Sequence, residues 1–269
     1  MVVPTMVGLR EEVAGLMVVA ILSTAIVISL LAPAVGFTPS YRLEWPWMMA
    51  WGERRPVAHY ERGVDEMFNA TSTVIFVDVS AGYVEVLCTN ASYSYIIEVY
   101  GNTDVWPLGG VSYEVDEEVV DGVLRVESKV SAGVLKIYVN PAILQELKIY
   151  VSAGAGSLRL IGLSDADVDI SVNAGSLDGE LTYVSVSDAE VKVNVNAGSL
   201  DLDIEVPGEV KVYLQASSTA SIVVAEVEGL GGLSLPSPGG QTLCDPDFTE
   251  GLRLTIDASS ATVNINVRR

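Results

Sequence analysis

Carboxylates are the residues best placed to do chemistry, because they recur at alternate positions along short apolar segments. Three acids alternate within residues 165–169, and three more within 201–205. Like charges stacked about 4.8 Å apart on neighbouring strands repel, and a calcium ion bound by carboxylate oxygens would relieve the repulsion. The sequence therefore gives weak calcium-site candidates: Asp167, Asp169, Asp178, Asp201 and Asp203. The alternative is a solvated polar face that strand alternation itself requires.

Other catalytic groups are scarce. The chain has one histidine, His59, and two cysteines, Cys88 and Cys244. A zinc site needs four closely spaced ligands, which these three residues cannot supply. The Gly-x-Ser-x-Gly motif is absent, and no glycine-rich loop opens a helix that could bind phosphate. Seven stacked strands would separate the cysteines by roughly 34 Å, so we expect free thiols.

A repeated phrase must position the acids. It consists of a β-branched or aliphatic residue, a polar residue, Ala, and then Gly or Ser. Its seven copies begin at Val79, Val130, Val151, Val172, Val195, Leu214 and Ile256. From Ala132 onward the alanines recur at nearly constant spacing, except that the last step, from Ala216 to Ala258, spans two units with an interrupted copy between them. A period of roughly 21 residues indicates a protein that stacks one structural unit.

Each unit reads as two short strands, because apolar and polar residues alternate on both sides of the phrase and valine dominates. Two all-β architectures fit: a parallel β-helix with one coil per unit, or an antiparallel sandwich in which each unit is a hairpin. In a β-helix each position stacks on its own copy, so Ala packs on Ala and Asn bonds to Asn. The identity of the copies therefore favours a parallel β-helix (solenoid) with coils of about 21 residues.

The Ala-Gly pair is predicted to form the corner of each coil. Alanine would point inward where a larger side chain collides with its neighbours, and glycine would supply the backbone freedom of the bend. The clear corners are Ala132, Gly133, Ala153, Gly154, Ala174, Gly175, Ala197 and Gly198. Ala81 lies half a period out of register, which assigns it to a capping strand. Ala91 lies close to two periods before Ala132, so the ladder is expected to start there.

The C-terminal part contains an interruption and a terminal strand. Residues 229–240 are rich in Gly and Pro, which predicts a loop inserted within a coil. The chain then ends in an alternating segment, Thr262–Val267. This segment is expected to be an exposed final strand, and Arg268 and Arg269 would hinder edge pairing.

The N-terminal segment is apolar. Residues 13–35 carry no charge, and a helix of this length covers about 34 Å, enough to cross a membrane. The segment is either a retained anchor or a cleaved signal peptide with a small-x-small site at Ala32–Ala34, and a pilin-type leader is a third reading. The predicted organisation is a hydrophobic anchor or signal helix (1–37), a Trp-rich juxtamembrane linker (38–74) and an acidic β-helical repeat domain (75–269).

Charge constrains location and partners. Residues 63–269 carry 30 acids against ten Lys or Arg, which accounts for the whole net charge of −20. Such a surface repels nucleic acid and attracts cations or cationic polymers. We expect the repeat domain to be extracytoplasmic, attached to the membrane through the N-terminal helix, or secreted if that helix is cleaved. Potential N-glycosylation sequons at Asn69 and Asn90 agree with this location.

The repeated Val-Asn-Ala-Gly-Ser-Leu-Asp phrase at Val172–Asp178 and Val195–Asp201, behind a hydrophobic N-terminus, carries a resemblance. It resembles the putative-adhesin domains of unknown function in bacterial and archaeal envelope proteins. The resemblance covers roughly residues 75–267 and implies a β-helical, non-enzymatic surface domain. It supplies no functional residues to carry over.

Three functional hypotheses follow. The first is a non-enzymatic, membrane-anchored extracytoplasmic β-solenoid with a structural or adhesive role, binding surface polymers without a cofactor. The second is a self-assembling surface filament or layer subunit, joined through its open end strands. The third is a calcium-dependent enzyme acting on polysaccharide, which would lose activity if Asp167 and Asp169 became Asn.

Overall fold

The structure is a computed structural model that describes residues 56–67, 69–89, 91–101, 111–236 and 238–269. Residues 54–269 form one compact region. The predicted N-terminal helix and the tryptophans at 45–51 lie outside the described residues. Within the described ranges, no helix is long and apolar enough to cross a membrane.

The described chain is almost entirely β, with sixteen strands in one large, mostly parallel sheet. A short 3-10 helix, η2 (Val64–Glu66), follows the first strand. The strands are β1 (Ala58–Gly63), β2 (Ser72–Val79), β3 (Gly82–Cys88), β4 (Tyr93–Tyr100), β5 (Tyr113–Val120), β6 (Val123–Val130), β7 (Gly133–Val139), β8 (Leu144–Ser164), β9 (Asp167–Ser185), β10 (Asp188–Glu205), β11 (Val212–Ser218), β12 (Ile222–Val227), β13 (Gly231–Pro236), β14 (Gly239–Cys244), β15 (Gly251–Ala258) and β16 (Ala261–Arg268). β1 and the start of β2 lie within residues 38–74, the predicted linker.

Three long strands, β8, β9 and β10, show how the repeat folds. They pair in parallel, and each residue of the repeated phrase lies beside its own copy: Ala153 beside Ala174, and Ala174 beside Ala197. The predicted stacking of like residues is therefore confirmed here. The alternative architecture, an antiparallel sandwich of hairpins, is wrong for these three strands because they pair in parallel.

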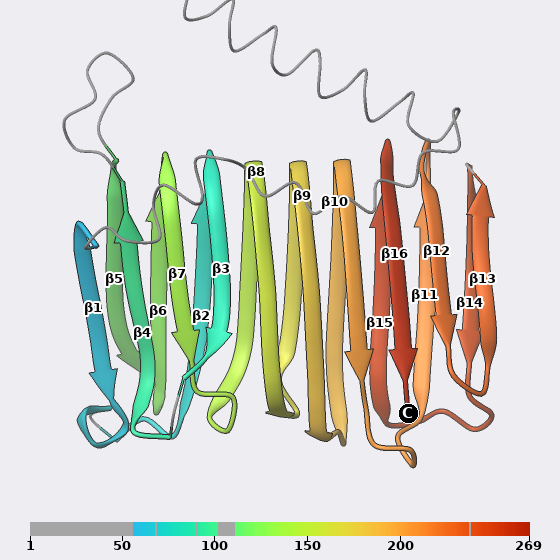
Figure 1. Cartoon of the computed structure of the whole chain (residues 1–269). Coiled ribbons are helices and arrows are strands. Elements are labelled where there is room, and N and C mark those ends of the chain that lie inside the picture. Colours follow the sequence, from blue (N-terminus) through green and yellow to red (C-terminus); the bar gives the residue numbers. More distant parts are fainter. Residues whose placement is uncertain (1–55, 68, 90, 102–110, 237) are drawn as a thin grey trace, which may run out of the picture. The chain divides into compact units, whose positions relative to one another are not determined.

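Each long strand folds over at its Ala-Gly corner, so the sheet has two layers (Figure 1). We call the strands before the corner the first layer and those after it the second layer. Elsewhere the two halves of a unit are separate strands, as in β2–β3, β6–β7, β11–β12 and β15–β16. Inward side chains of both layers, such as Ile170 and Leu181, are fully buried in one apolar cluster. Alternation thus places one side of every strand in the core and the other in solvent.

The spatial order of the units differs from their order in the chain. Along the stack the units follow the order β6–β7, β2–β3, β8, β9, β10, β15–β16, β11–β12. Gly82 pairs with both Gly133 and Gly154, so the phrase at Val79 is part of the ladder, and its assignment to a capping strand is wrong. The expected ladder start at Ala91 is also wrong, because this residue is in the turn between β3 and β4.

The C-terminal expectations need a similar correction. β16 is not an exposed final strand, because it pairs in parallel with β10 on one side and β12 on the other. The Gly/Pro-rich segment is not merely a loop: its strands β13 and β14 pair antiparallel with β12 and β11. The outermost strands are therefore β13 and β14 at one end, and β1 and β5 at the other.

A column of glycines explains why the corner tolerates no side chain. A Cβ at Gly175 would lie 1.9 Å from the carbonyl oxygen of Gly154, and one at Gly198 would lie 2.0 Å from that of Gly175. These glycines also have φ near +150°, which L side chains rarely adopt. The corner alanines are partly buried, and their inward orientation stays a prediction. Close approach of backbones, rather than of alanines, sets the corner.

The last two copies of the phrase have another role. Ala258 pairs with Val195 rather than with Ala197, and Ala216 pairs with Ile256. Both alanines are buried strand residues. At the corner of β15–β16, Ala261 takes the place of the column glycine beside Gly198, and Ser260 adopts a positive φ of 82°. The Ala216–Ser217 copy therefore lies within β11, whereas Ala258 ends β15 and Ser259 begins the bend that leads to β16.

Candidate binding site

The calcium candidates of the first layer lie at the start of β9. Asp167 and Asp169 point outward, and an Asp167 oxygen accepts a hydrogen bond of 2.8 Å from the Glu190 amide. Burial raises the pKa of both carboxyls above the ordinary value. One oxygen of Asp169 is buried without a hydrogen-bond partner, and Lys148 and Lys192 lie beside Asp169 on the flanking strands. The lysines partly offset the cost of this burial.

The candidates of the second layer lie on β9 and β10. Asp178 and Asp201 are register partners, as their position after the same corner predicted. Burial is the first cause that raises the pKa of Asp201, and the charges of Asp178 and Asp203 add to it. Asp203 is paired with Arg268, at 2.9 Å, and accepts a hydrogen bond of 3.0 Å from Asn266.

The corner separates these five acids into two sets on opposite layers. No group of three or more His, Cys, Asp or Glu side chains that could hold a metal ion occurs in the described parts of the chain. The charges of Asp178 and Asp203 disfavour the ionised form of Asp201. The five carboxylates form outward rows on two polar faces.

The structure also places the two cysteines and the asparagines that the sequence analysis named. Cys88 and Cys244 are both free thiols, and the Cys88 sulfur accepts a hydrogen bond of 3.1 Å from the Ile161 amide. Asn69 lies exposed in a turn, whereas Asn90 is outside the described residues. The predicted asparagine ladder is present at Asn196, which donates to Asn173 at 3.2 Å.

A small hollow on the first layer brings two aromatic rings together with charged groups. Its volume is about 260 Å³, and its lining includes Phe76, Tyr150 and Asp169. The Lys148 ammonium lies 5.0 Å from the centre of the Phe76 ring and 2.8 Å from Glu146, so one face of that ring is already covered. This hollow is a shallow feature of the flat face.

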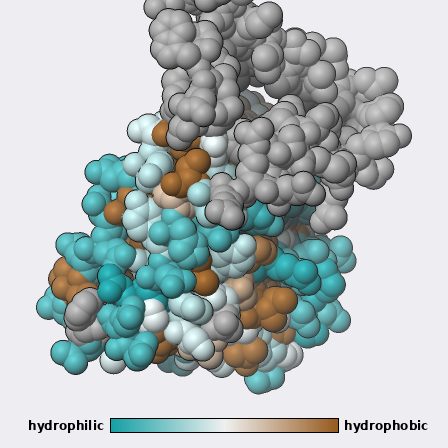
Figure 2. All heavy atoms as spheres, turned by 60° about the vertical axis from the view of Figure 1, so that its left-hand side comes forward, coloured by the Kyte–Doolittle hydropathy of each residue, from teal (hydrophilic) through white to brown (hydrophobic). Residues whose placement is uncertain are grey.

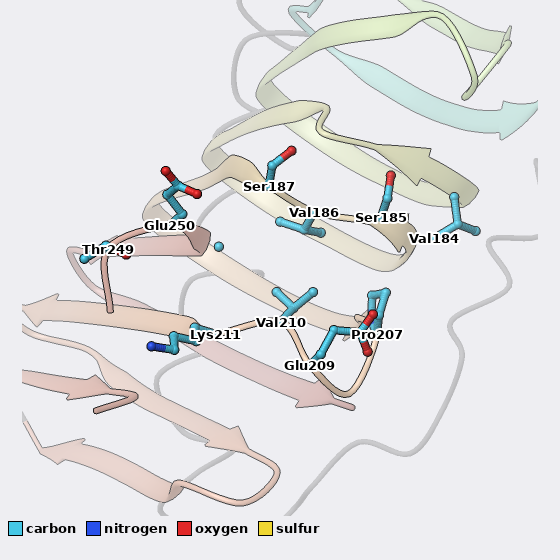
Figure 3. A pocket seen from close by; sticks show the side chains of 11 residues that line it. Val184, Ser185, Val186, Ser187, Pro207, Glu209, Val210, Lys211, Thr249 and Glu250 are labelled. Carbon is cyan, nitrogen blue, oxygen red and sulfur yellow. The ribbon is translucent and has the colours of Figure 1, made fainter. Parts of the chain in front are cut away.

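A larger groove lies where chain order and spatial order diverge. β9 and β10 are neighbours joined by a short turn, but β15 lies between β10 and β11, so residues 206–211 must pass the start of β15. The connection leaves a groove of about 470 Å³ between three segments, 184–187, 207–211 and 249–251 (Figure 3).

The groove combines apolar and charged side chains. Val184 is 61% exposed at its rim, and Val186, Pro207 and Val210 supply further apolar surface. Glu209 and Glu250 are exposed beside them, while the Lys211 ammonium is engaged, donating to the Asp247 carbonyl at 2.8 Å. The groove therefore suits an apolar group that carries hydrogen-bond donors or positive charge.

One face of the described surface is mostly polar. On the face shown in Figure 2, hydrophilic residues predominate, and apolar residues form separate small areas. Exposed large apolar residues include Tyr150, Ile161, Val184 and Val224. Sequence reasoning found the acidic rows but missed the groove and the aromatic hollow, because both combine residues from distant segments.

Comparison with known proteins identifies the fold. No family description matches the chain, and no curated protein matches it. The structure of a putative adhesin from Parabacteroides merdae aligns with 77% of this chain and 95% of its own, with 12% identity and a TM-score of only 0.20. A putative cell adhesion protein from Clostridium sporogenes matches 80% of this chain and 100% of its own, with 13% identity and a TM-score of 0.61. The chain thus shares its fold with the solved structure of a putative cell adhesion protein.

Proposed function

We propose that this chain is a non-enzymatic surface protein with an adhesive or structural role, and that it belongs with the putative-adhesin domains. The observation that carries the proposal is the stacking of like residues in β8, β9 and β10, which builds two flat polar faces rather than an enclosed site. The shared fold with a putative cell adhesion protein supports it. Adhesion would use the acidic faces and the groove.

The finer form of the fold belongs to the same proposal. The chain is a β-solenoid in which each unit is one coil, since β9 is offset by one repeat from β8 on one side and from β10 on the other. Parallel pairing and unbroken chain order from β8 through β10 support a continuous winding in this part of the stack. A solenoid presents long flat surfaces to partners.

Membrane attachment and location complete the proposal. The apolar segment at 13–35 anchors the chain, and the acidic region lies outside the cytoplasm. Cell fractionation combined with protease treatment of intact cells tests both statements. The full chain should sediment with membranes and be cleaved from outside. Recovery of a protease-protected chain in the cytoplasm would contradict the location.

An adhesion assay tests the role of the groove. Cells that display the full chain should adhere to immobilised chitosan, a cationic glycan, more than to heparin, because the net charge of −20 attracts cations. Val184→Lys places a positive charge in the groove and should reduce adhesion to chitosan at least several-fold. Val224→Lys is the matched control, since this valine is 41% exposed and lies outside the groove. Equal adhesion by displaying and non-displaying cells to every polymer would refute the adhesive role.

A further inference from the structure

The aromatic hollow on the first layer gathers side chains that the groove does not use. Most of them come from three neighbouring strands, β2, β8 and β9. Register pairing arranges them in two outward rows across these strands: Phe76, Lys148 and Asp169 in one, and Asp78, Tyr150 and Ser171 in the other. The hollow therefore holds two aspartates, one on each side of the central strand β8.

Both aspartates lie beside lysines that are already engaged. Asp78 is the register partner of Lys129, and Asp169 is that of Lys148 and Lys192. The ammonium group of each lysine instead lies 2.8–2.9 Å from the glutamate two residues before it on the same strand. In the parts of the chain that the structure describes, neither aspartate forms an ion pair.

Each aspartate also has an unsatisfied oxygen. The Oδ1 atoms of Asp78 and Asp169 are buried and accept no hydrogen bond, a state that only one atom each of Ser128 and Arg269 shares among the described residues. A buried acceptor without a donor costs free energy, and a bound group with N–H donors would offset that cost. Burial also raises the pKa of Asp169, because it disfavours the charged form. The hollow therefore favours a ligand that donates hydrogen bonds and carries positive charge.

An exposed ring on β8 adds a second requirement. Tyr150 is 43% exposed and lies in register between Asp78 and Ser171. The Phe76 ring is covered on one face by the Lys148 ammonium, so Tyr150 offers the larger open ring surface. Such a ring packs well against the C–H face of a saturated ring, and the hydroxyls of Tyr150 and Ser171 can bond further hydroxyl groups. A bare cation would leave this surface unused.

We infer that the aromatic hollow binds a protonated amino-sugar unit of a cationic glycan. The sugar ammonium would donate to Asp78 or Asp169, the C–H face of the sugar ring would pack on Tyr150, and Ser171 would bond a sugar hydroxyl. The inference rests on the proposed adhesive function and deepens it by naming the group that one acidic face recognises. The groove is a separate contact, so the two sites can be tested separately.

Isothermal titration calorimetry of the full chain with a glucosamine tetramer tests the inference. The matched ligand is the N-acetylated tetramer, which has the same rings but no ammonium groups at about pH 5.5. The chain should bind the glucosamine tetramer at least about ten-fold more tightly. Equal affinity for the two would overturn recognition through an ammonium group. Spermidine, a linear amine without a ring, should bind several-fold more weakly, and equal or tighter binding of spermidine would overturn the assignment to a sugar.

Charge-matched variants locate the site. Asp78→Asn combined with Asp169→Asn removes two charges from the hollow and should weaken binding of the glucosamine tetramer at least about ten-fold. Asp178→Asn combined with Asp201→Asn removes the same charge from the opposite layer and should change the affinity less than two-fold. Equal losses in the two double variants would overturn the hollow as the site, because general attraction by the net negative charge would then explain the binding.

A ring variant tests the packing contact. Tyr150→Ala should weaken binding several-fold, whereas Tyr113→Ala, which removes a tyrosine of similar exposure (37%) on β5, should leave it unchanged. Thermal melting confirms that each variant is folded. Unchanged binding by folded Tyr150→Ala would overturn the contact between Tyr150 and the sugar ring.

Cells that display the chain separate this inference from the proposed function. If the purified chain binds the glucosamine tetramer through Asp78 and Asp169 while displaying cells do not adhere to any polymer, the hollow stands and the adhesive role fails. If displaying cells adhere to chitosan equally well with and without Asp78→Asn and Asp169→Asn, and the purified double variant binds the tetramer normally, the hollow fails and the adhesive role stands.

Discussion

The centre of the stack and its two ends follow different rules. In β8, β9 and β10 the chain order equals the spatial order, and the alanines and glycines of the repeated phrase pair with their own copies. At each end one unit is inserted out of order: β2–β3 lies between β6–β7 and β8, and β15–β16 lies between β10 and β11–β12. The repeat therefore determines which residues can stack, while the connections decide which unit takes each place.

Replacing a central column glycine should have the largest effect. Gly175→Val places a Cβ only 1.9 Å from the Gly154 carbonyl oxygen, at a residue whose φ is +150°. We expect a loss of more than about 3 kcal/mol of unfolding free energy, or no folding, in urea titration. Gly208→Ala is the control, since no heavy atom lies within 4 Å of its added Cβ. Normal stability of the valine variant would contradict the close backbone contact at the centre.

Truncating a core side chain of the inserted unit should come next. Ile256 is fully buried in β15, so Ile256→Ala should cost about 2–5 kcal/mol. Leu243 is partly buried on the outermost strand β14. The change Leu243→Ala should lower the free energy of unfolding by only about 1 kcal/mol. Urea unfolding of both variants measures the difference. Equal losses would mean that β15 is as peripheral as β14.

Two carboxylates should respond to pH in opposite directions. The folded-state pKa of Asp201 is raised, so its contribution to stability is present below about 3.8 and is lost as pH rises through the raised value. The pKa of Asp165 is lowered, chiefly because the Ser187 amide donates to its carboxylate, so its contribution is present above about 3.8 and is lost at lower pH.

Thermal melting at pH 7 and pH 3 checks these signs. Asp201→Asn should raise the melting temperature at pH 7 by a few degrees at most, and Asp165→Asn should lower it. Both differences should shrink at pH 3. If Asp201→Asn instead lowered the melting temperature at pH 7, that result would indicate a stabilising cation bound between the Asp178 and Asp201 carboxylates.

Loss of the hydrogen bond between Asn196 and Asn173 should have the smallest effect on stability. Asn196→Ala removes the exposed hydrogen bond to Asn173 and should cost about 0.5 kcal/mol. Asn194→Ala, on the same strand, is a control for loss of an exposed amide. A cost above about 2 kcal/mol would show that the ladder, rather than the glycine column, holds the corner.

The sequence predicted the local rules well. Alternation identified the strands, the repeated Val-Asn-Ala-Gly phrase identified the corners from Gly133 to Gly198, and the equivalent positions of Asp178 and Asp201 predicted their pairing. These features follow from neighbours in the chain or from repetition of one position. The stacking order does not, because any unit with the same apolar pattern can fit beside any other.

The groove could not be predicted for the same reason. Its segments 184–187, 207–211 and 249–251 meet only because β15 separates β10 from β11. One signal was present: the regular spacing of the alanines is interrupted after Ala216, next to the place where the order breaks. The phrases that begin at Leu214 and Ile256 match the corner phrase in composition only. Their alanines do not pair with the corner alanines, so these two phrases do not mark corners as the earlier copies do.

The glycine column also bears on how such a chain can change in length over evolution. Since β9 presents the same corner, core and outward positions to β8 and to β10, duplication of one central repeat would supply both of the new surfaces that it needs. Gene duplication in steps of one repeat would lengthen the molecule by about 4.8 Å per copy. The middle of the stack is the region open to such growth, whereas the interleaved ends are locked by their connections and can only be inherited whole.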